Sequence, residues 1–196
     1  MAGISRGRLG RASWIVVAAL ACGGRATSPG QGKPEPQPVR VVVLAQAMLL
    51  EASGPPVADT SVSFTTGQPR TIVLRHGPPE NLVFAELVFP PTAFADSGRT
   101  VQVELKPRPG LYGLDLRVSL PLKGRANLVF KYGRYFLAPA KARAIYGGDV
   151  AFERALSVGQ LLPEGQLALL PSTRPAADNL RAAISAGGTY FVAAAQ

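Results

Sequence analysis

The clearest pattern in the chain is an alternation of apolar and polar side chains at every second position. It is strongest in segments 101–106, 114–120 and 126–132. In the first of these, Val101, Val103 and Leu105 share one face, and amide or charged side chains occupy the other. Successive side chains of a strand point to opposite faces. Each segment is therefore predicted to be a strand with one buried and one solvated face, as in antiparallel sheets.

Weaker alternation extends this prediction to both sides of the middle of the chain. The further predicted strands are 39–44, 61–65, 71–75, 82–89, 180–184 and 189–193. The first continues to Leu50 with residues that also fit a helical turn, and the run from Phe152 to Leu161 fits either one short helix or another strand. Proline and glycine clusters separate the segments. The prediction is an all-β fold, an antiparallel β-sandwich of about nine or ten short strands with at most one short helix.

The N-terminal region has a different pattern, typical of a secretory signal peptide over residues 1–21. Arg6, Arg8 and Arg11 precede an apolar run from Trp14 to Ala21 that ends in small residues. The run is far shorter than the roughly 20 residues that a membrane-spanning helix needs.

Ala19-Leu20-Ala21-Cys22 resembles the bacterial lipobox, although lipoboxes usually carry leucine at the position of Ala19. The resemblance implies that Cys22 is acylated, becomes the first residue of the mature chain and anchors it in a membrane of the bacterial envelope. Gly23 favours the outer membrane over retention on the periplasmic face of the inner one. An ordinary signal peptide cleaved near a cysteine is the alternative. Cys22 is the only cysteine, and acylation would explain why it has no disulfide partner.

Residues 22–38 are predicted to be a lipidated cysteine followed by a disordered tether, and residues 39–196 the β-sandwich domain. The tether contains Pro34, Pro36 and Pro38 and almost no apolar side chain, so it cannot bury enough surface to fold.

Charge narrows the classes of partner. The chain carries a net charge of +9, and removal of residues 1–21 leaves 18 basic and 12 acidic residues, a net charge of +6. We expect most of these basic side chains on solvated strand faces and in turns; the alternative is that the net charge attracts anionic lipid or cell-wall polymer. The basic residues are scattered, and an exported chain without a recognition helix or a stacking motif is not expected to bind nucleic acid.

Several of these segments together resemble the ZU-five domain, a β-sandwich, over roughly residues 60–195. Residues 87–94 (LVFPPTAF), 100–103 (TVQV), 126–132 (ANLVFKY), 169–172 (LLPS) and 188–193 (GTYFVA) carry the resemblance. Some members of that family carry His-Phe-Ser before the last strand and cleave themselves there, whereas this chain has Ala186-Gly187-Gly188. The resemblance therefore implies protein contacts and no self-cleavage.

No catalytic or metal-binding motif stands out in the chain. His76 is the only histidine and lies at the end of a predicted strand, where we expect a polar residue in a turn. No serine lies in a G-x-S-x-G elbow, and one cysteine with one histidine does not suit a zinc site. We therefore predict no catalytic residue, no metal and no cofactor, and favour a protein that is not an enzyme.

The best candidate for a contact surface is the cluster Tyr132, Arg134, Tyr135 and Phe136, because tyrosine and arginine are enriched at binding hot spots. A hairpin with Gly133 in its turn is the alternative that we favour for this segment. Together these observations favour a membrane-tethered lipoprotein whose domain contacts an envelope protein or cell-wall polymer. A structural envelope component without a ligand and a hydrolase with an unrecognised site remain the alternatives.

Overall fold

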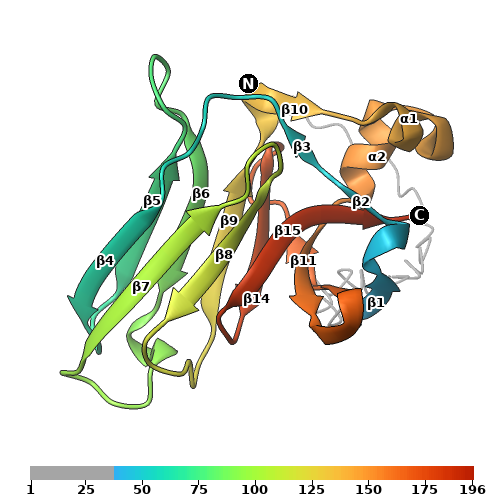
Figure 1. The fold of residues 1–196 in the computed structure, drawn as a ribbon. Helices are drawn as coiled ribbons and strands as arrows, with labels where there is room; N and C mark the ends of the chain where they lie inside the picture. Colours follow the sequence, from blue (N-terminus) through green and yellow to red (C-terminus); the bar gives the residue numbers. More distant parts are fainter. Residues whose placement is uncertain (1–37) are drawn as a thin grey trace, which may run out of the picture. The chain divides into compact units, whose positions relative to one another are not determined.

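The computed structural model describes residues 38–196 of the chain (Figure 1). The predicted signal peptide, Cys22 and all of the predicted tether except Pro38 lie outside the described residues. Within them the fold is all-β, which confirms the predicted class.

The larger of the two main sheets has eight strands, ordered β1-β12-β11-β15-β8-β7-β4, with β2 paired to β15. All of its pairs are antiparallel. Its strands are β1 (Arg40–Val43), β2 (Ala47–Leu49), β4 (Thr60–Thr65), β7 (Thr100–Pro107), β8 (Gly113–Val118), β11 (Ser157–Leu162), β12 (Gln166–Leu169) and β15 (Gly188–Ala195).

The smaller main sheet has five strands in the order β13-β14-β9-β6-β5, and β10 and β3 form a separate pair. The strands are β5 (Arg70–Arg75), β6 (Val83–Phe89), β9 (Ala126–Lys131), β13 (Ser172–Thr173) and β14 (Asn179–Ile184), with β3 (Glu51–Ala52) and β10 (Phe136–Leu137) in the pair. The two main sheets form two layers (Figure 1). One apolar core lies between them, to which β7 contributes Val103 and Leu105, and β6 and β9 contribute Leu87 and Leu128.

The described residues contain fifteen strands and two helices, more of each than the sequence predicted. Three of the extra strands, β3, β10 and β13, have two residues each, too few to show an alternation. The run from Phe152 to Leu161 contains both predicted alternatives, because it covers the end of α2 (Asp149–Ala155) and most of β11. The other helix, α1 (Ala140–Tyr146), was missed, since seven residues are too few to show a helical period.

Both helices pack on the core with one face. Ala142 and Phe152 are fully buried, whereas Ile145 and Val150 are exposed. Gly147 ends α1 in the left-handed conformation, with φ of 77°, which glycine adopts without strain. No helix among residues 38–196 combines the length and the apolar character needed to cross a bilayer.

The outer face of the eight-stranded sheet, which points away from the core, is divided into two halves. One half carries a second apolar cluster that includes Leu167, Phe191 and Ala193. Leu44 and Leu49, from the 3-10 helix Leu44–Gln46 and from β2, pack against this cluster. The other half, formed by β4, β7 and β8, carries polar side chains and stays open to solvent.

Candidate functional site

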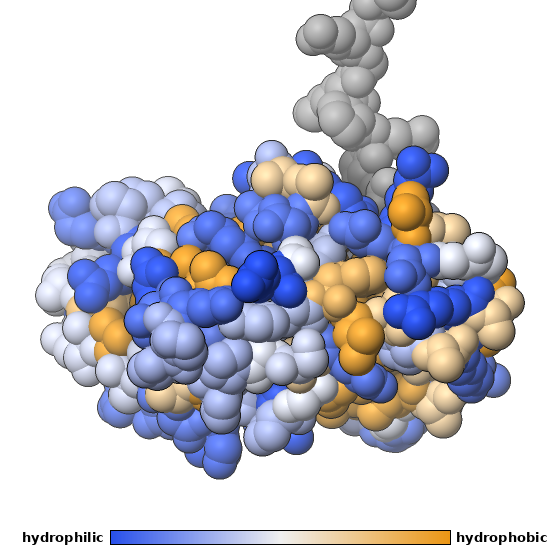
Figure 2. All heavy atoms as spheres, turned by 90° about the horizontal axis from the view of Figure 1, so that it is seen from above, coloured by the Kyte–Doolittle hydropathy of each residue, from blue (hydrophilic) through white to orange (hydrophobic). Residues whose placement is uncertain are grey.

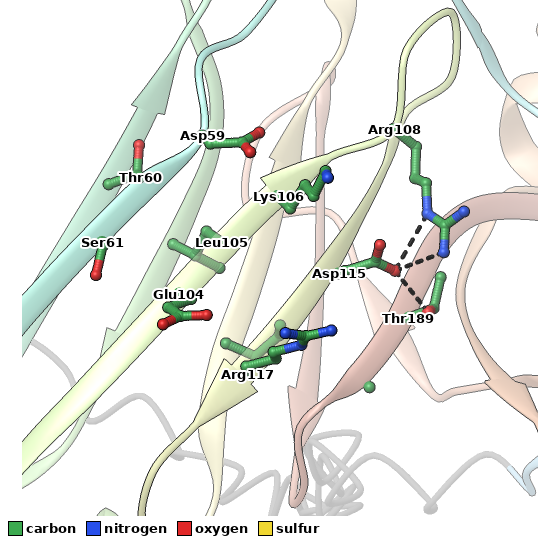
Figure 3. Close-up of a pocket in the computed structure, with 12 residues that line it drawn as sticks. Asp59, Thr60, Ser61, Glu104, Leu105, Lys106, Arg108, Asp115, Arg117 and Thr189 are labelled. Carbon is green, nitrogen blue, oxygen red and sulfur yellow. Dashed lines mark hydrogen bonds and ion pairs between the residues drawn. The ribbon is translucent and has the colours of Figure 1, made fainter.

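The open half of this sheet face contains a groove of about 640 Å³ (Figure 3). The groove crosses β4, β7, β8 and β15, and its lining residues are 59–61, 104–106, 108, 115–117 and 188–189. It differs from the contact surface predicted from the sequence, with which it shares no residue.

Strand register places the polar side chains of the groove in two rows across the sheet. In one row Ser61 lies opposite Glu104, which lies opposite Arg117. In the other row Lys106 lies opposite Asp115, and Asp115 lies opposite Thr189 on β15. Side chains directly opposite each other on one face are close enough to interact. Residues from four strands therefore form one continuous polar surface.

The second row ends in a hydrogen-bonded network around Asp115 (Figure 3). Arg108 donates to Asp115 Oδ1 from Nη2 at 2.8 Å and from Nε at 3.1 Å. The Thr189 hydroxyl donates to the same oxygen at 2.6 Å. Burial alone would raise the pKa of Asp115, but the hydrogen bonds from Thr189 and Arg108 outweigh it and hold this pKa below its ordinary value. Asp115 is therefore a fixed negative charge at neutral pH.

The remaining charges of the groove have no ionic partner among residues 38–196. Lys106 and Arg117 form no salt bridge there, and neither do Asp59 and Glu104. Glu104 accepts a hydrogen bond of 3.1 Å from Gln102 Nε2. Charges of both signs therefore remain available to a ligand. None of the lining residues is aromatic.

The groove has little that could act as a nucleophile and no imidazole base. Its hydroxyls belong to Thr60, Ser61 and Thr189, and the last already donates to Asp115. Residues 38–196 contain no group of three or more histidine, cysteine or acidic side chains placed to hold a metal ion. The arrangement suits recognition through charge and hydrogen bonds.

The sequence-predicted contact cluster does not form a continuous surface, and one of its members is corrected. Tyr132 belongs to the core, with only 1% of its surface exposed, and burial raises its pKa to about 12. Its hydroxyl lies 3.2 Å from Glu153 Oε1. The Phe136 ring is half-buried, with its centre 5.9 Å from that of Tyr132. Core packing therefore uses these two aromatic side chains.

Arg134 and Tyr135 do lie together at the surface. Both contact Glu80, with Arg134 Nη2 at 3.1 Å and the Tyr135 hydroxyl at 2.6 Å. The hydrogen bond from Tyr135 has the larger effect and that from Arg134 the next larger, and together they lower the pKa of Glu80. The hairpin alternative is also wrong, because Gly133 begins a 3-10 helix and the strand that follows it, β10, pairs with β3 and not with β9.

His76 is a core residue and not the polar turn residue that we expected. It is 3% exposed, and its Nδ1 lies 2.7 Å from the Pro55 carbonyl oxygen. Its ring packs against Phe84 and Tyr135 at centre distances of 5.4 and 4.7 Å. Because a carbonyl only accepts hydrogen bonds, Nδ1 carries the donated proton. The period-2 pattern could have shown this burial, since Ile72 and Leu74 point inward and His76 is the next residue in that series.

Sequence reasoning missed the groove, although the signal for its polar wall was present. Glu104 and Lys106 were predicted to lie on the solvated face of a strand, and they do. The sequence did not show that β4 and β8 pair with this strand, or that β15 pairs with β8. That pairing turns separate polar faces into one site.

Comparison with known proteins finds no relative: no family model, no curated protein and no solved structure matches the chain. The resemblance to the ZU-five domain therefore stays a prediction.

Proposed function

We propose that the mature protein is a lipid-anchored, non-enzymatic binding module of the bacterial envelope, and that its groove holds an extended peptide segment with charges of both signs. Such a segment can belong to an envelope protein or to the peptide part of a cell-wall polymer. The observation that carries the proposal is the set of unpaired charges of both signs, Asp59, Glu104, Lys106 and Arg117, in one groove.

The chemistry of the groove supports a peptide more than a sugar chain. Sugar rings are commonly held by stacking on aromatic side chains, and the groove offers none. A peptide of mixed charge can pair its cations with Glu104 and its anions with Arg117, which lie opposite each other on neighbouring strands. Complementary charges of this kind determine specificity and association rate more than raw affinity.

The anchor rests on the sequence. The charged and apolar parts of residues 1–21 fit an export signal, and Cys22 follows small residues as lipid-modified cysteines do. Intact mass of the mature protein tests this part directly. A mass of residues 22–196 plus a diacylglyceryl group on the sulfur and an acyl chain on the N-terminus is expected, and a mass without lipid would contradict the anchor.

The groove is tested by photocrosslinking in cells that make the full-length protein. A photoreactive residue at Ser61, in the groove, is expected to give a discrete adduct whose partner peptide mass spectrometry identifies. The matched control is the same residue at Thr71, which is exposed on β5 of the other sheet. The double variant Glu104→Lys/Arg117→Glu should remove the adduct at Ser61. Equal adducts at both positions, or none at Ser61, would contradict the proposal.

A further inference from the structure

A second surface collects most of the large apolar side chains that residues 38–196 leave exposed. Five of the eight belong to β1 and its preceding residue or to α1 and α2: Val39, Val41, Val43, Ile145 and Val150, each at least 50% exposed. We call these five residues the apolar end. Single exposed aliphatic side chains are ordinary, but a local concentration of them marks an interaction site.

Contacts show that the two parts of the apolar end belong to one region of the domain. The Tyr146 hydroxyl at the end of α1 donates to the carbonyl of Ala195 at the end of β15. The next residue, Gln196, donates its backbone N–H to Gln46 at 2.9 Å, three residues after β1. Arg40 in β1 is also close enough to Tyr146 to act on it electrostatically. Figure 1 shows α1, α2, β1 and the C-terminus on the same side.

The strand β1 leaves its valines uncovered because it is the edge of its sheet. It pairs only with β12. Val42 packs against the second apolar cluster, so Val41 and Val43 point to the opposite side. There they remain about half exposed. Figure 2 shows more apolar residues on the right-hand side, where α1, α2 and the C-terminus lie in Figure 1, than on the left-hand side, which contains β4 and β5.

Charge at the apolar end favours an anionic surface. Segments 39–43 and 140–155 together contain four basic residues, Arg40, Lys141, Arg143 and Arg154, and two acidic ones, Asp149 and Glu153. The Arg143 guanidinium pairs with Asp149 at 2.6 Å. The Lys141 side chain and that of Arg40 are exposed and unpaired within the described residues. Each basic residue near an anionic bilayer contributes about 1 kcal/mol of attraction.

We infer that the apolar end rests on the surface of the lipid bilayer in which the protein is anchored. This inference depends on the proposed acylation of Cys22. Sixteen residues then separate the lipid from Val39, a reach of roughly 50 Å at 3.1–3.5 Å per residue. A tether of this length holds the domain at an effective concentration of about a millimolar. At that effective concentration, even the weak affinity of five aliphatic side chains for lipid keeps the apolar end on the bilayer.

Docking in this way leaves the groove free. The groove is formed by β4, β7, β8 and the start of β15, whereas the apolar end lies beyond the other end of β15. The bilayer would orient the domain, and the groove would remain accessible to its partner.

The test places an environment-sensitive fluorophore on one introduced cysteine of the acylated protein in vesicles. Acylation blocks the thiol of Cys22, so Val41→Cys is labelled alone. Vesicles of phosphatidylcholine and phosphatidylglycerol that contain brominated acyl chains, which quench only nearby fluorophores, are expected to reduce its emission about twofold, as for a side chain at the headgroup boundary. The matched control is Ser61→Cys in the groove, whose emission should not change. Adding Ile145→Asp and Val150→Asp to Val41→Cys should weaken the quenching.

Each of the next three outcomes overturns the inference, and the three can be told apart. Vesicle-bound protein without quenching at Val41 contradicts the inference and leaves the anchor intact. A blue shift at Val41 without quenching by the brominated lipid means that a second copy or another protein covers the apolar end. Labelling of Cys22 together with a lipid-free mass contradicts the anchor, and the inference falls with it. Loss of the Ser61 adduct alone contradicts only the function proposed for the groove.

Discussion

The two halves of one sheet face show how the same architecture serves packing in one place and recognition in another. Strand β7 alternates strictly between exposed and buried residues from Thr100 to Pro107. Strand β15 is buried on both faces from Tyr190 to Ala195. Tyr190 points into the main core, and Phe191 points the other way, into the second apolar cluster. Both strands belong to the same sheet, separated only by β8.

The difference arises from what covers each half. Near β15, the side chains of Leu44, Ala47 and Leu49 pack against the outer-face cluster; β2, which carries two of them, is paired beside β15 in the sheet. The outward positions of β7 and β8 in the open half carry charged side chains instead, including Glu104, Lys106 and Arg117, and these line the groove. We therefore expect substitutions in the covered half to change stability, and substitutions in the open half to change binding.

The largest effect is expected from Phe191→Ala in the covered half. The ring is 6% exposed, and its removal leaves a cavity in the second apolar cluster. The free energy of unfolding should fall by about 3 kcal/mol, measured by urea denaturation. The matched control is Gln102→Ala in the open half, which should change it by less than about 0.5 kcal/mol. Equal losses in both variants would mean that the two halves do not differ.

A smaller loss is expected from Gly113→Ala on β8, the strand of the open half that pairs with β15. A Cβ at Gly113 would lie 2.5 Å from the Phe191 ring and 3.1 Å from the Tyr190 carbonyl oxygen. The crowding should cost about 1–3 kcal/mol of unfolding free energy. In the Phe191→Ala background the same substitution should cost clearly less, because the ring is gone. Additive losses in the double variant would show that contact with the ring is not the cause.

Thr189→Val should lower stability at neutral pH and reduce the loss of stability on acidification by the same amount. The pKa of Asp115 is held below its ordinary value in the folded protein, so ionised Asp115 stabilises the fold above the pKa that this side chain has in the unfolded chain. This stabilisation is lost as the pH falls through the lowered pKa. Without the Thr189 hydroxyl the pKa should move up, and less stability should be lost on acidification. Carboxyl chemical shifts in an NMR titration measure the pKa, and an unchanged value would contradict the role of Thr189.

The smallest effect on stability is expected from Glu104→Gln and Arg117→Gln. Both side chains lie in the open groove without a salt bridge in the described part of the chain. Each should change the free energy of unfolding by less than about 0.5 kcal/mol, while reducing the Ser61 adduct proposed above. A large loss of stability from either variant would show that the open half also supports the fold.

Prediction from sequence was best where local pattern alone decides the structure. The alternation of Val101, Val103 and Leu105 with polar residues placed β7 and its buried face correctly. It failed where burial depends on distant segments. Tyr132 and Arg134 were both candidates for the contact surface, but Tyr132 is buried in the core and Arg134 is exposed. The two-residue strands β3 and β10 form because they pair with each other, and the paired residues are 84 or more positions apart in the chain. A local pattern in the sequence cannot show such a pair.

The sequence by itself determined that the described chain forms antiparallel strands with one solvated and one buried face. Side chains alternate in direction along a strand, whichever strand it pairs with. Only the tertiary structure decided which solvated strand faces lie side by side in the sheet. The pairing of β4, β7, β8 and β15 brings Asp59, Glu104, Lys106 and Arg117 into one groove. Strand order depends on contacts between residues far apart in the chain, and no local pattern of side chains encodes it.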